Sequence, residues 1–212
     1  MRLTELFDKT QWRSNWLQAG NHVSWDFEWH DSTLLLFFQP SCEKIDWARN
    51  FFFKKVPYKH MNEKFKVHAG FLKAWKEVSS EIRKLVHDSK VKRIVISGYS
   101  HGAALAGLCF ETCAYERPDL KASDNIVGYG FECPRFLAEK HPSKELLDRW
   151  DGFYDIYIPG DIVHSLPLKL FRYANVGKSV RLTKHFKYGP FASHSQAVVY
   201  WGLRFCDIEV RL

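Results

Sequence analysis

The sequence predicts an α/β fold, with a mostly parallel central sheet and helices on both faces of that sheet. Three observations predict it. Residues 23–29 alternate apolar and polar side chains, as in a strand with one buried face, and 33–39 form a continuous apolar run suited to a central strand. Residues 71–86 instead carry apolar side chains at helical spacing, and strands that alternate with helices indicate a parallel sheet covered on both faces.

The same alternation continues along the rest of the chain. Further strands are predicted at 93–97, 126–131, 153–158 and 179–183, and further helices from about Gly102, near 143–150 and at 194–203. The sequence contains no linker, internal repeat or low-complexity tract between these elements. Residues 1–212 are therefore predicted to form a single domain.

The composition predicts a sizeable core and no membrane span. The 212 residues are 46% hydrophobic, and no apolar run reaches the length of a transmembrane helix. The first residues, MRLTELFDKTQW, carry acidic side chains and lack the apolar stretch of a secretory signal, which predicts a cytoplasmic protein. Five cysteines without a C-x-x-C spacing predict free thiols rather than a disulfide framework or a zinc site: Cys42, Cys109, Cys113, Cys133 and Cys206.

The net charge of +7 favours anionic partners, which include nucleic acid and anionic lipid. An ordinary basic surface explains the same charge. The sequence has no glycine-rich phosphate loop and no recognisable nucleic-acid-binding module, so nucleic acid is not expected as a partner. No clustered metal ligands are recognisable either, and neither a metal nor another cofactor is predicted.

The segment GYSHG, residues 98–102, lies between a predicted strand and a predicted helix. It matches G-x-S-x-G, in which a serine occupies a strained strand-to-helix turn and the glycines avoid collisions with neighbouring backbone. Such a turn exposes the hydroxyl of Ser100 above the sheet. It also places the amide of His101 at the start of a helix, where it can stabilise an oxyanion. The alternative is an ordinary turn in which Ser100 caps the helix.

A nucleophilic serine needs a general base, and the base needs an acid that orients it. Asp161 directly follows the apolar strand at 153–158, where parallel sheets collect their active-site groups. Asp155 lies inside that strand and Asp151 before it. Asp161 is therefore the predicted acid.

The base is expected late in the chain, after the acid. His194 meets that condition and lies in a loop at the start of a predicted helix, with His185 as its rival. His164 follows Asp161 by three residues and is interpreted as a loop residue. The side chain of His101 is expected to point away from the position of the base.

Six segments between about residues 33 and 203 resemble, in order, the motifs of one family. LLLFFQPS, KIDWARN and VHAGFLKAW are similar to F-R-G-S or F-R-G-T, a following D-W or N-W segment, and V-H-x-G-F-x-x-A. VISGYSHGAALAGL, ECPRF and GDIVHSLP are similar to V-x-x-G-H-S-L-G-G-A-L-A, G-x-P-R-V and N-D-I-V-P-x-L-P. HSQAVVYW occupies the place of the family's late histidine. The chain thus resembles the fungal-type triacylglycerol lipases, or class 3 lipases, a branch of the α/β-hydrolases.

The resemblance implies a role for five positions. Ser100 corresponds to the nucleophile, Asp161 to the orienting acid and His194 to the general base. Ser41 corresponds to the serine or threonine that forms the oxyanion hole together with the residue after the nucleophile. The backbone amides of Ser41 and His101 are therefore expected to bind the oxyanion.

Other positions depart from the family's pattern or have a supporting role. Gln39-Pro40 replaces the arginine and glycine before the oxyanion residue, and the proline removes an amide donor, so this loop is expected to be reshaped. His101 and Ala103 replace the usual leucine and glycine, and Glu132 replaces the glycine before P-R. His68 corresponds to a histidine near the site, where packing or hydrogen bonding is expected rather than direct catalysis.

Residues 42–60 occupy the place of the family's lid. They combine Trp47 and residues 51–53, all phenylalanine, with basic side chains, as expected of a surface that contacts an anionic lipid boundary. The competing interpretation is an aromatic anchor buried in the core and surrounded by solvated lysines.

Together these features predict a serine hydrolase that cleaves carboxylic esters of lipids, either a triacylglycerol lipase or a carboxylesterase, through an acyl-enzyme. A lipid or small ester is the expected substrate, with peripheral contact to an anionic lipid surface and no transmembrane segment. Two alternatives remain: an acyltransferase or thioesterase with the same triad, and a catalytically silent lipid-binding or interaction protein.

Overall fold

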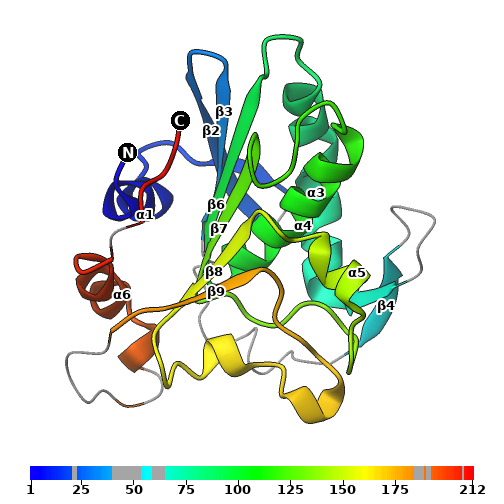
Figure 1. The fold of residues 1–212 in the computed structure, drawn as a ribbon, viewed down its shortest axis with the longest axis vertical. Helices are drawn as coiled ribbons and strands as arrows, with labels where there is room; N and C mark the ends of the chain where they lie inside the picture. The colour runs from blue at the N-terminus through cyan, green and yellow to red at the C-terminus, as the bar shows by residue number, and fades with distance from the viewer. Residues whose placement is uncertain (21–22, 40–53, 59–64, 184–188, 190–191, 207) are drawn as a thin grey trace.

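A seven-stranded sheet forms the centre of the protein in a computed structural model of the chain (Figure 1). The structure describes residues 1–212 except 21–22, 40–53, 59–64, 184–188, 190–191 and 207. The strands lie in the order β1-β2-β3-β6-β7-β8-β9. Their bounds are β1 Leu17–Ala19, β2 Val23–His30, β3 Thr33–Phe38, β6 Arg93–Tyr99, β7 Ile126–Phe131, β8 Phe153–Tyr157 and β9 Lys178–Arg181.

The sheet is mostly parallel, as the sequence predicts. β1 pairs with β2 and β2 with β3 in antiparallel fashion, whereas the pairs from β3 through β6, β7 and β8 to β9 are all parallel. The register aligns Phe38 with Gly98 and Gly98 with Gly130. The carboxyl ends of β3, β6 and β7 therefore lie side by side, and this edge carries the candidate site.

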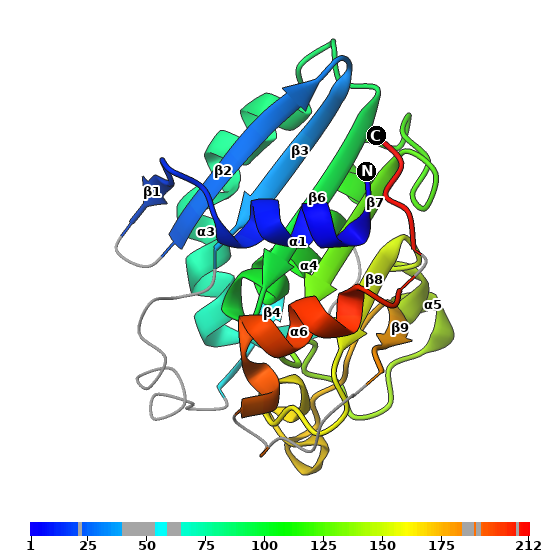
Figure 2. The ribbon, with the colours of Figure 1, turned by 90° about the vertical axis from the view of Figure 1, so that its left-hand side faces the viewer.

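Helices cover both faces of the sheet (Figures 1 and 2). Those over one face come from the middle of the chain, and those over the other come from near its two ends. α3 (Ala69–Val86), α4 (His101–Glu116) and α5 (Lys144–Asp148) lie on one side, and α1 (Leu3–Gln11) and α6 (Gln196–Leu203) on the other. Successive residues of one strand enter opposite cores: Leu36 packs among the side chains under α3 and α4, and Leu35 among those under α1 and α6. This alternation follows from the period of two in a strand.

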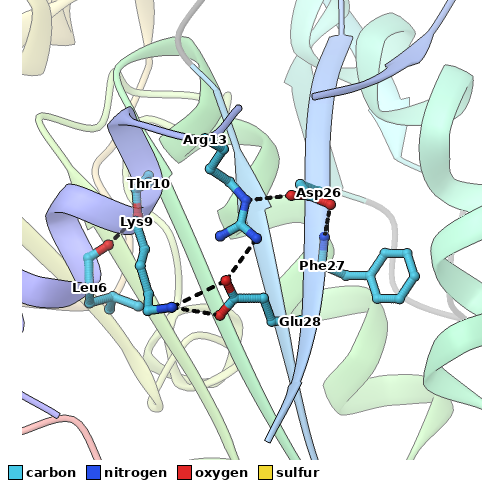
Figure 3. Close-up of polar contacts among 7 residues, drawn as sticks. All are labelled: Leu6, Lys9, Thr10, Arg13, Asp26, Phe27 and Glu28. Carbon is cyan, nitrogen blue, oxygen red and sulfur yellow. Dashed lines mark hydrogen bonds and ion pairs between the residues drawn. The ribbon is translucent and has the colours of Figure 1, made fainter. Parts of the chain in front are cut away.

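The helix α1 has no counterpart among the predicted elements. Polar contacts attach it and the residues after it to β2 (Figure 3). Arg13 bonds Asp26 through Nε and, through Nη2, Glu28 at 2.9 Å, and Lys9 Nζ lies 2.8 Å from the same Glu28 carboxylate. Thr10 adds a buried contact with Ser97 of β6, 2.6 Å between the two hydroxyl oxygens. The buried residues of α1 (Leu3, Leu6, Phe7 and Thr10) follow helical spacing, so the sequence carries a local signal for this helix that the predicted elements above do not include.

A second, two-stranded antiparallel sheet consists of β4 (Lys55–Tyr58) and β5 (Phe65–His68). β4 falls within the predicted lid segment 42–60, and most of that segment, with Trp47 and residues 51–53, lies outside the described residues. Short 3-10 helices complete the chain: η1 (Val163–Ser165), η2 (Lys169–Phe171) and η3 (Ala192–His194).

Two further expectations concern cysteines and membranes. Cys109, Cys113, Cys133 and Cys206 are free thiols, as predicted, and Cys42 lies outside the described residues. Within the described part of the chain, no helix combines the length and the apolar character needed to cross a bilayer.

Candidate active site

Ser100 occupies a strained corner between β6 and α4. Its backbone has φ 56° and ψ −121°, a conformation that costs a non-glycine residue on the order of 1–3 kcal/mol and is found mainly at functional sites. The hydroxyl makes no hydrogen bond that caps α4, which argues against a plain helix cap. Its Oγ lies instead 2.9 Å from His194 Nε2.

The two glycines of the corner allow backbone segments to approach closely. A Cβ atom on Gly98 would lie 2.1 Å from the carbonyl oxygen of Gly102, and one on Gly102 would lie 2.3 Å from that of Phe38. Both contacts are with backbone, which cannot rotate away. The expected collision of side chains at these positions is therefore confirmed, and the corner requires glycine on both sides of Tyr99-Ser100-His101.

His194 and Asp161 complete a hydrogen-bonded chain behind the serine. His194 Nδ1 lies 2.6 Å from Asp161 Oδ2, and Asp161 Oδ1 accepts the amide of Val163 at 2.8 Å. The loop after β8 carries Asp161, and η3 carries His194. The structure thus brings together the three residues that the sequence predicted as nucleophile, acid and base.

The environment of Asp161 favours its ionised form. Burial opposes ionisation of this carboxyl, but its interactions with His194, with the neighbouring Glu132 and with the amide of Val163 outweigh burial and lower its pKa. An ionised Asp161 accepts the Nδ1 proton of His194 and leaves Nε2 with a lone pair directed at Ser100. This is the protonation state that a general base requires.

Tyr99, which the sequence analysis did not single out, supports His194 from β6. Its ring stacks on the imidazole with centroids 5.3 Å apart and planes 18° apart, and its hydroxyl donates to the backbone carbonyl of His194. Burial raises the pKa of Tyr99, so the hydroxyl remains a donor. Tyr99 is the variable residue of G-x-S-x-G, a position for which the motif gives no signal.

The predicted oxyanion hole is described only in part. His101 is the first residue of α4, and its ring packs against Phe71 of α3 at a centroid distance of 5.4 Å. Its side chain is thus directed toward α3, consistent with the expectation that it points away from the base. Ser41 and Pro40 lie outside the described residues, so the roles of the Ser41 and His101 amides stay predictions.

Glu132 directly follows β7 and lies beside the triad. It is 0% exposed and has a positive φ of 53°, the conformation in which glycine is free of strain. That conformation gives a physical reason for the glycine in the family's motif. The sequence showed the departure at Glu132 but not its burial or its contact with Asp161.

The other histidines that the sequence analysis weighed have different surroundings. His164 lies in η1 and bonds Asp155 through Nε2 at 2.9 Å, and His185 lies outside the described residues. His68 caps α3 by accepting the Gly70 amide at 3.1 Å, and burial lowers its pKa to about 4. It therefore packs and hydrogen-bonds as a neutral ring.

Among the described residues, the donor atoms of Glu132, Asp161 and His194 converge to within 4.8 Å of one another, as metal ligands would. Bonds within the protein already engage these groups. His194 Nδ1 pairs with Asp161 Oδ2, and Glu132 Oε1 accepts the amide of Ile158 at 2.7 Å. We therefore interpret the cluster as the acid end of the triad rather than as a metal site.

A family model described as Lipase (class 3) matches residues 35–171, more than half of the chain. The chain belongs to the class 3 lipase family. In this class 3 lipase, Ser100 and Asp161 lie within the matched segment and His194 lies after it. The assignment of His194 therefore depends on its contacts with Ser100 and Asp161. A comparison with curated proteins found no match.

Solved lipases have a similar fold. The triacylglyceride lipase of Rhizomucor miehei matches with a TM-score of 0.68 and 21% identity, over 79% of this chain and 66% of that one. The lipase of Rhizopus microsporus var. chinensis matches with a TM-score of 0.61 and 20% identity, over 75% and 57%. The mono- and diacylglycerol lipase of Aspergillus oryzae matches with 0.59 and 21%, over 72% and 55%. The chain spans less than two thirds of the length of these lipases, and at such identities the likeness establishes the α/β-hydrolase fold.

Proposed function

We propose that this chain is a serine hydrolase that cleaves carboxylic esters of lipids, as a triacylglycerol lipase or a carboxylesterase. One observation carries the proposal: the unbroken chain from Ser100 Oγ through both ring nitrogens of His194 to a buried, ionised Asp161, with contacts of 2.9 and 2.6 Å. A hydroxyl, an imidazole and a carboxylate in this order are what acyl transfer through serine requires.

The reaction has two steps. Ser100 Oγ attacks the ester carbonyl while its proton passes to His194 Nε2, and Asp161 steadies the imidazolium that forms. His194 then returns the proton to the departing alcohol, which leaves an acyl group on Ser100. Water, deprotonated by His194, attacks this acyl-enzyme and releases the carboxylic acid. The α4 N-terminus, with the His101 amide, supports the negative oxygen of both tetrahedral intermediates.

The test compares Ser100→Ala with Ser80→Ala, which changes an exposed serine on α3. Hydrolysis of p-nitrophenyl butyrate is expected to fall by roughly 10⁴-fold or more in Ser100→Ala and to remain unchanged in Ser80→Ala. A fluorophosphonate should label the wild type and Ser80→Ala at Ser100 and leave Ser100→Ala unlabelled. An unlabelled wild type would instead favour a silent lipid-binding protein.

A second measurement separates hydrolysis from transfer. Adding an alcohol or a thiol acceptor to the assay is expected to leave the carboxylic acid as the main product. A product in which the acyl group moves to the acceptor faster than to water would favour the acyltransferase alternative.

We further propose peripheral contact with an anionic lipid surface. Support comes from the segment around η2, which exposes three apolar side chains: Leu168 (42%), Leu170 (70%) and Phe171 (38%). Two cationic residues, Lys169 and Arg172, lie between and next to them in the sequence. Exposed apolar side chains flanked by cations suit the boundary of an anionic bilayer. Leu170→Asp should weaken sedimentation with vesicles containing phosphatidylserine, whereas Leu212→Asp, at an exposed apolar residue elsewhere, should not. If both variants sedimented with the vesicles to the same extent as the wild type, the proposed lipid contact would be contradicted.

A further inference from the structure

Glu132 occupies a position that is unfavourable for its residue type in three separate ways. Its backbone is left-handed, with φ 53°, a conformation that is strained for a residue with a side chain. Its carboxyl is fully buried, and burial strongly disfavours an ionised carboxylate. It also lies beside a second carboxyl, that of Asp161. Glycine would avoid all three, so the position calls for an explanation of why glutamate occupies it.

The side chain of Glu132 connects β7 to the segment that carries Asp161. The Glu132 amide donates to the carbonyl of Ile156 at 2.8 Å, which continues the pairing of β7 with β8 by one residue. Its Oε1 then accepts the amide of Ile158 at 2.7 Å, where β8 has already ended. The carbonyl of Ile158 in turn accepts the amide of Asp161 at 3.2 Å. A change at Glu132 therefore reaches the acid of the triad through two hydrogen bonds.

The groups around the Glu132 carboxyl favour its acid form. Burial and the neighbouring carboxyl of Asp161 raise its pKa well above the ordinary range, and the charge of Asp155 adds to this, against the Ile158 amide, which lowers it. The other titratable groups that surround it are Tyr99 of β6 and His194 of η3. Oε2 is buried and has no hydrogen-bond partner among the described residues, and the carboxyls of Glu132 and Asp161 approach each other to within 4.8 Å. A proton on Glu132 turns this carboxyl into a donor that faces an ionised acceptor.

We propose that Glu132 is a positioning residue of the hydrolase: its carboxyl, in the acid form, donates a hydrogen bond to Asp161 and fixes the Ile158–Asp161 turn behind His194. The inference rests on the proposed function, because it assigns to Glu132 a share in holding the acid of that triad. In this role Glu132 keeps its own proton throughout turnover. Glu132 contacts neither the substrate nor the reacting atoms.

The proposed hydrogen bond from Glu132 to Asp161 weakens the hold of Asp161 on the protonated form of His194. A donor shared with Asp161 disperses the charge of that carboxylate, so the carboxylate holds the proton of the imidazolium less tightly. The base can then release its proton to the leaving alcohol and return to the neutral form. Removal of the donor should shift the acid limb of the activity profile to higher pH, since Asp161 then favours protonated His194 more strongly.

Infrared spectroscopy tests the protonation directly. The C=O stretch of a protonated carboxyl lies apart from the bands of carboxylates and of the backbone amides. At pH 7 the wild type and Glu81→Gln, which changes an exposed glutamate of α3, should both show this band. Glu132→Gln should lose it. A wild-type spectrum whose band is unaffected by Glu132→Gln would overturn the proposal, and this measurement stands even if the protein hydrolyses no ester.

The pH profile of kcat/KM for p-nitrophenyl butyrate tests the positioning role. Glu132→Gln keeps an oxygen for the Ile158 amide and supplies an N–H donor for Asp161, so kcat/KM should stay within about threefold of the wild type, with the same acid limb. Glu132→Leu lacks both groups, so its kcat/KM should fall at least about tenfold and the acid limb of its pH profile should move to higher pH. Glu132→Gly restores the strain-free residue and guards against poor folding of the leucine variant, and it should show the same shifted limb. A glycine variant with the wild-type kcat/KM and acid limb would show that Glu132 does not position Asp161.

Discussion

The described residues contain two buried pairs of histidine and aspartate, and only one of them meets a serine. In the first pair, His194 Nδ1 lies 2.6 Å from Asp161, and in the second, His164 Nε2 lies 2.9 Å from Asp155. Both carboxyls are buried. Both imidazoles stack on a tyrosine, His194 on Tyr99 and His164 on Tyr157 at 4.1 Å. By composition and burial the two pairs are nearly equivalent.

The pairs differ in which ring nitrogen contacts the acid. Asp161 bonds Nδ1 of His194, which leaves Nε2, at the far end of the ring, for the hydroxyl of Ser100 at 2.9 Å. Asp155 instead bonds Nε2 of His164, and the amide nitrogen of Asn175 lies 3.1 Å from that same atom. In the second pair Nε2, the atom that contacts the serine in the first pair, is thus already engaged by the acid and by Asn175. An acid and an imidazole act on a hydroxyl only where a strained corner such as that of Ser100 delivers one to the free end of the ring.

The same substitution at both histidines gives the largest contrast between the pairs. His194→Gln should lower kcat for p-nitrophenyl butyrate by about 10³-fold or more, because the proton of Ser100 loses its acceptor. His164→Gln should leave kcat within about threefold, since glutamine can still donate to Asp155 and no reacting group touches His164. Steady-state kinetics on both purified variants measures the contrast.

Circular dichroism confirms beforehand that each histidine variant is folded. If a folded His164→Gln variant also lost three orders of magnitude in kcat, the second pair would belong to the active site and would not differ from the first in function.

The carboxyls of the two pairs should affect stability in opposite directions as the pH changes. Burial raises the pKa of Asp155, although His164 opposes it, so its stabilising contribution is present below the ordinary value of 3.8 and is lost as the pH rises through its folded value. The hydrogen bonds to Asp161 overcome burial and lower its pKa, so its contribution is present above 3.8 and is lost as the pH falls through its folded value. Each unit of pKa shift corresponds to about 1.4 kcal/mol.

Urea unfolding of Asp155→Asn and Asp161→Asn from pH 3 to 7 measures these slopes. Relative to Asp155→Asn, the wild type should lose unfolding free energy as the pH rises above about 4. Relative to Asp161→Asn, it should lose unfolding free energy as the pH falls below about 4. Asp31→Asn, at a side chain that is 95% exposed, serves as the matched control and should follow the wild type throughout. Slopes of the same sign for both buried positions would show that their environments do not differ in the way described.

The sequence predicted the parts of the site that follow from order and motif. The strand, the turn and the helix around Ser100 and the late position of His194 were readable because each has a local pattern or a place in a chain order. Asp155 and Asp161 were told apart by their position inside or after a strand. The choice of Asp161 agrees with the geometry because side chains after a parallel strand collect at the carboxyl edge of the sheet.

The parts that the sequence did not predict depend on contacts between distant residues. Helical spacing of Leu3, Leu6 and Phe7 marks the buried face of α1, but the ion pairs of Arg13 with β2 join residues that no local pattern connects. Glu132 was visible only as a departure from a glycine. It is buried where its amide meets the carbonyl of Ile156 in β8, and its neighbour Asp161 comes from a loop 29 residues later in the printed sequence.

Tyr99 gives the smallest expected effect and the finest comparison between the pairs. Tyr99→Phe keeps the ring that stacks on His194 but removes the hydroxyl that donates to the His194 carbonyl. A partly buried carbonyl without its donor costs about 1 kcal/mol, and a less firmly held imidazole should lower kcat about three- to tenfold. Tyr157→Phe makes the matched change at the tyrosine that stacks on His164, and kcat should not change because that pair does not take part in the reaction. If Tyr99→Phe retained the wild-type kcat, the stacked ring alone would suffice to hold His194, and the two tyrosines would have the same role in their pairs.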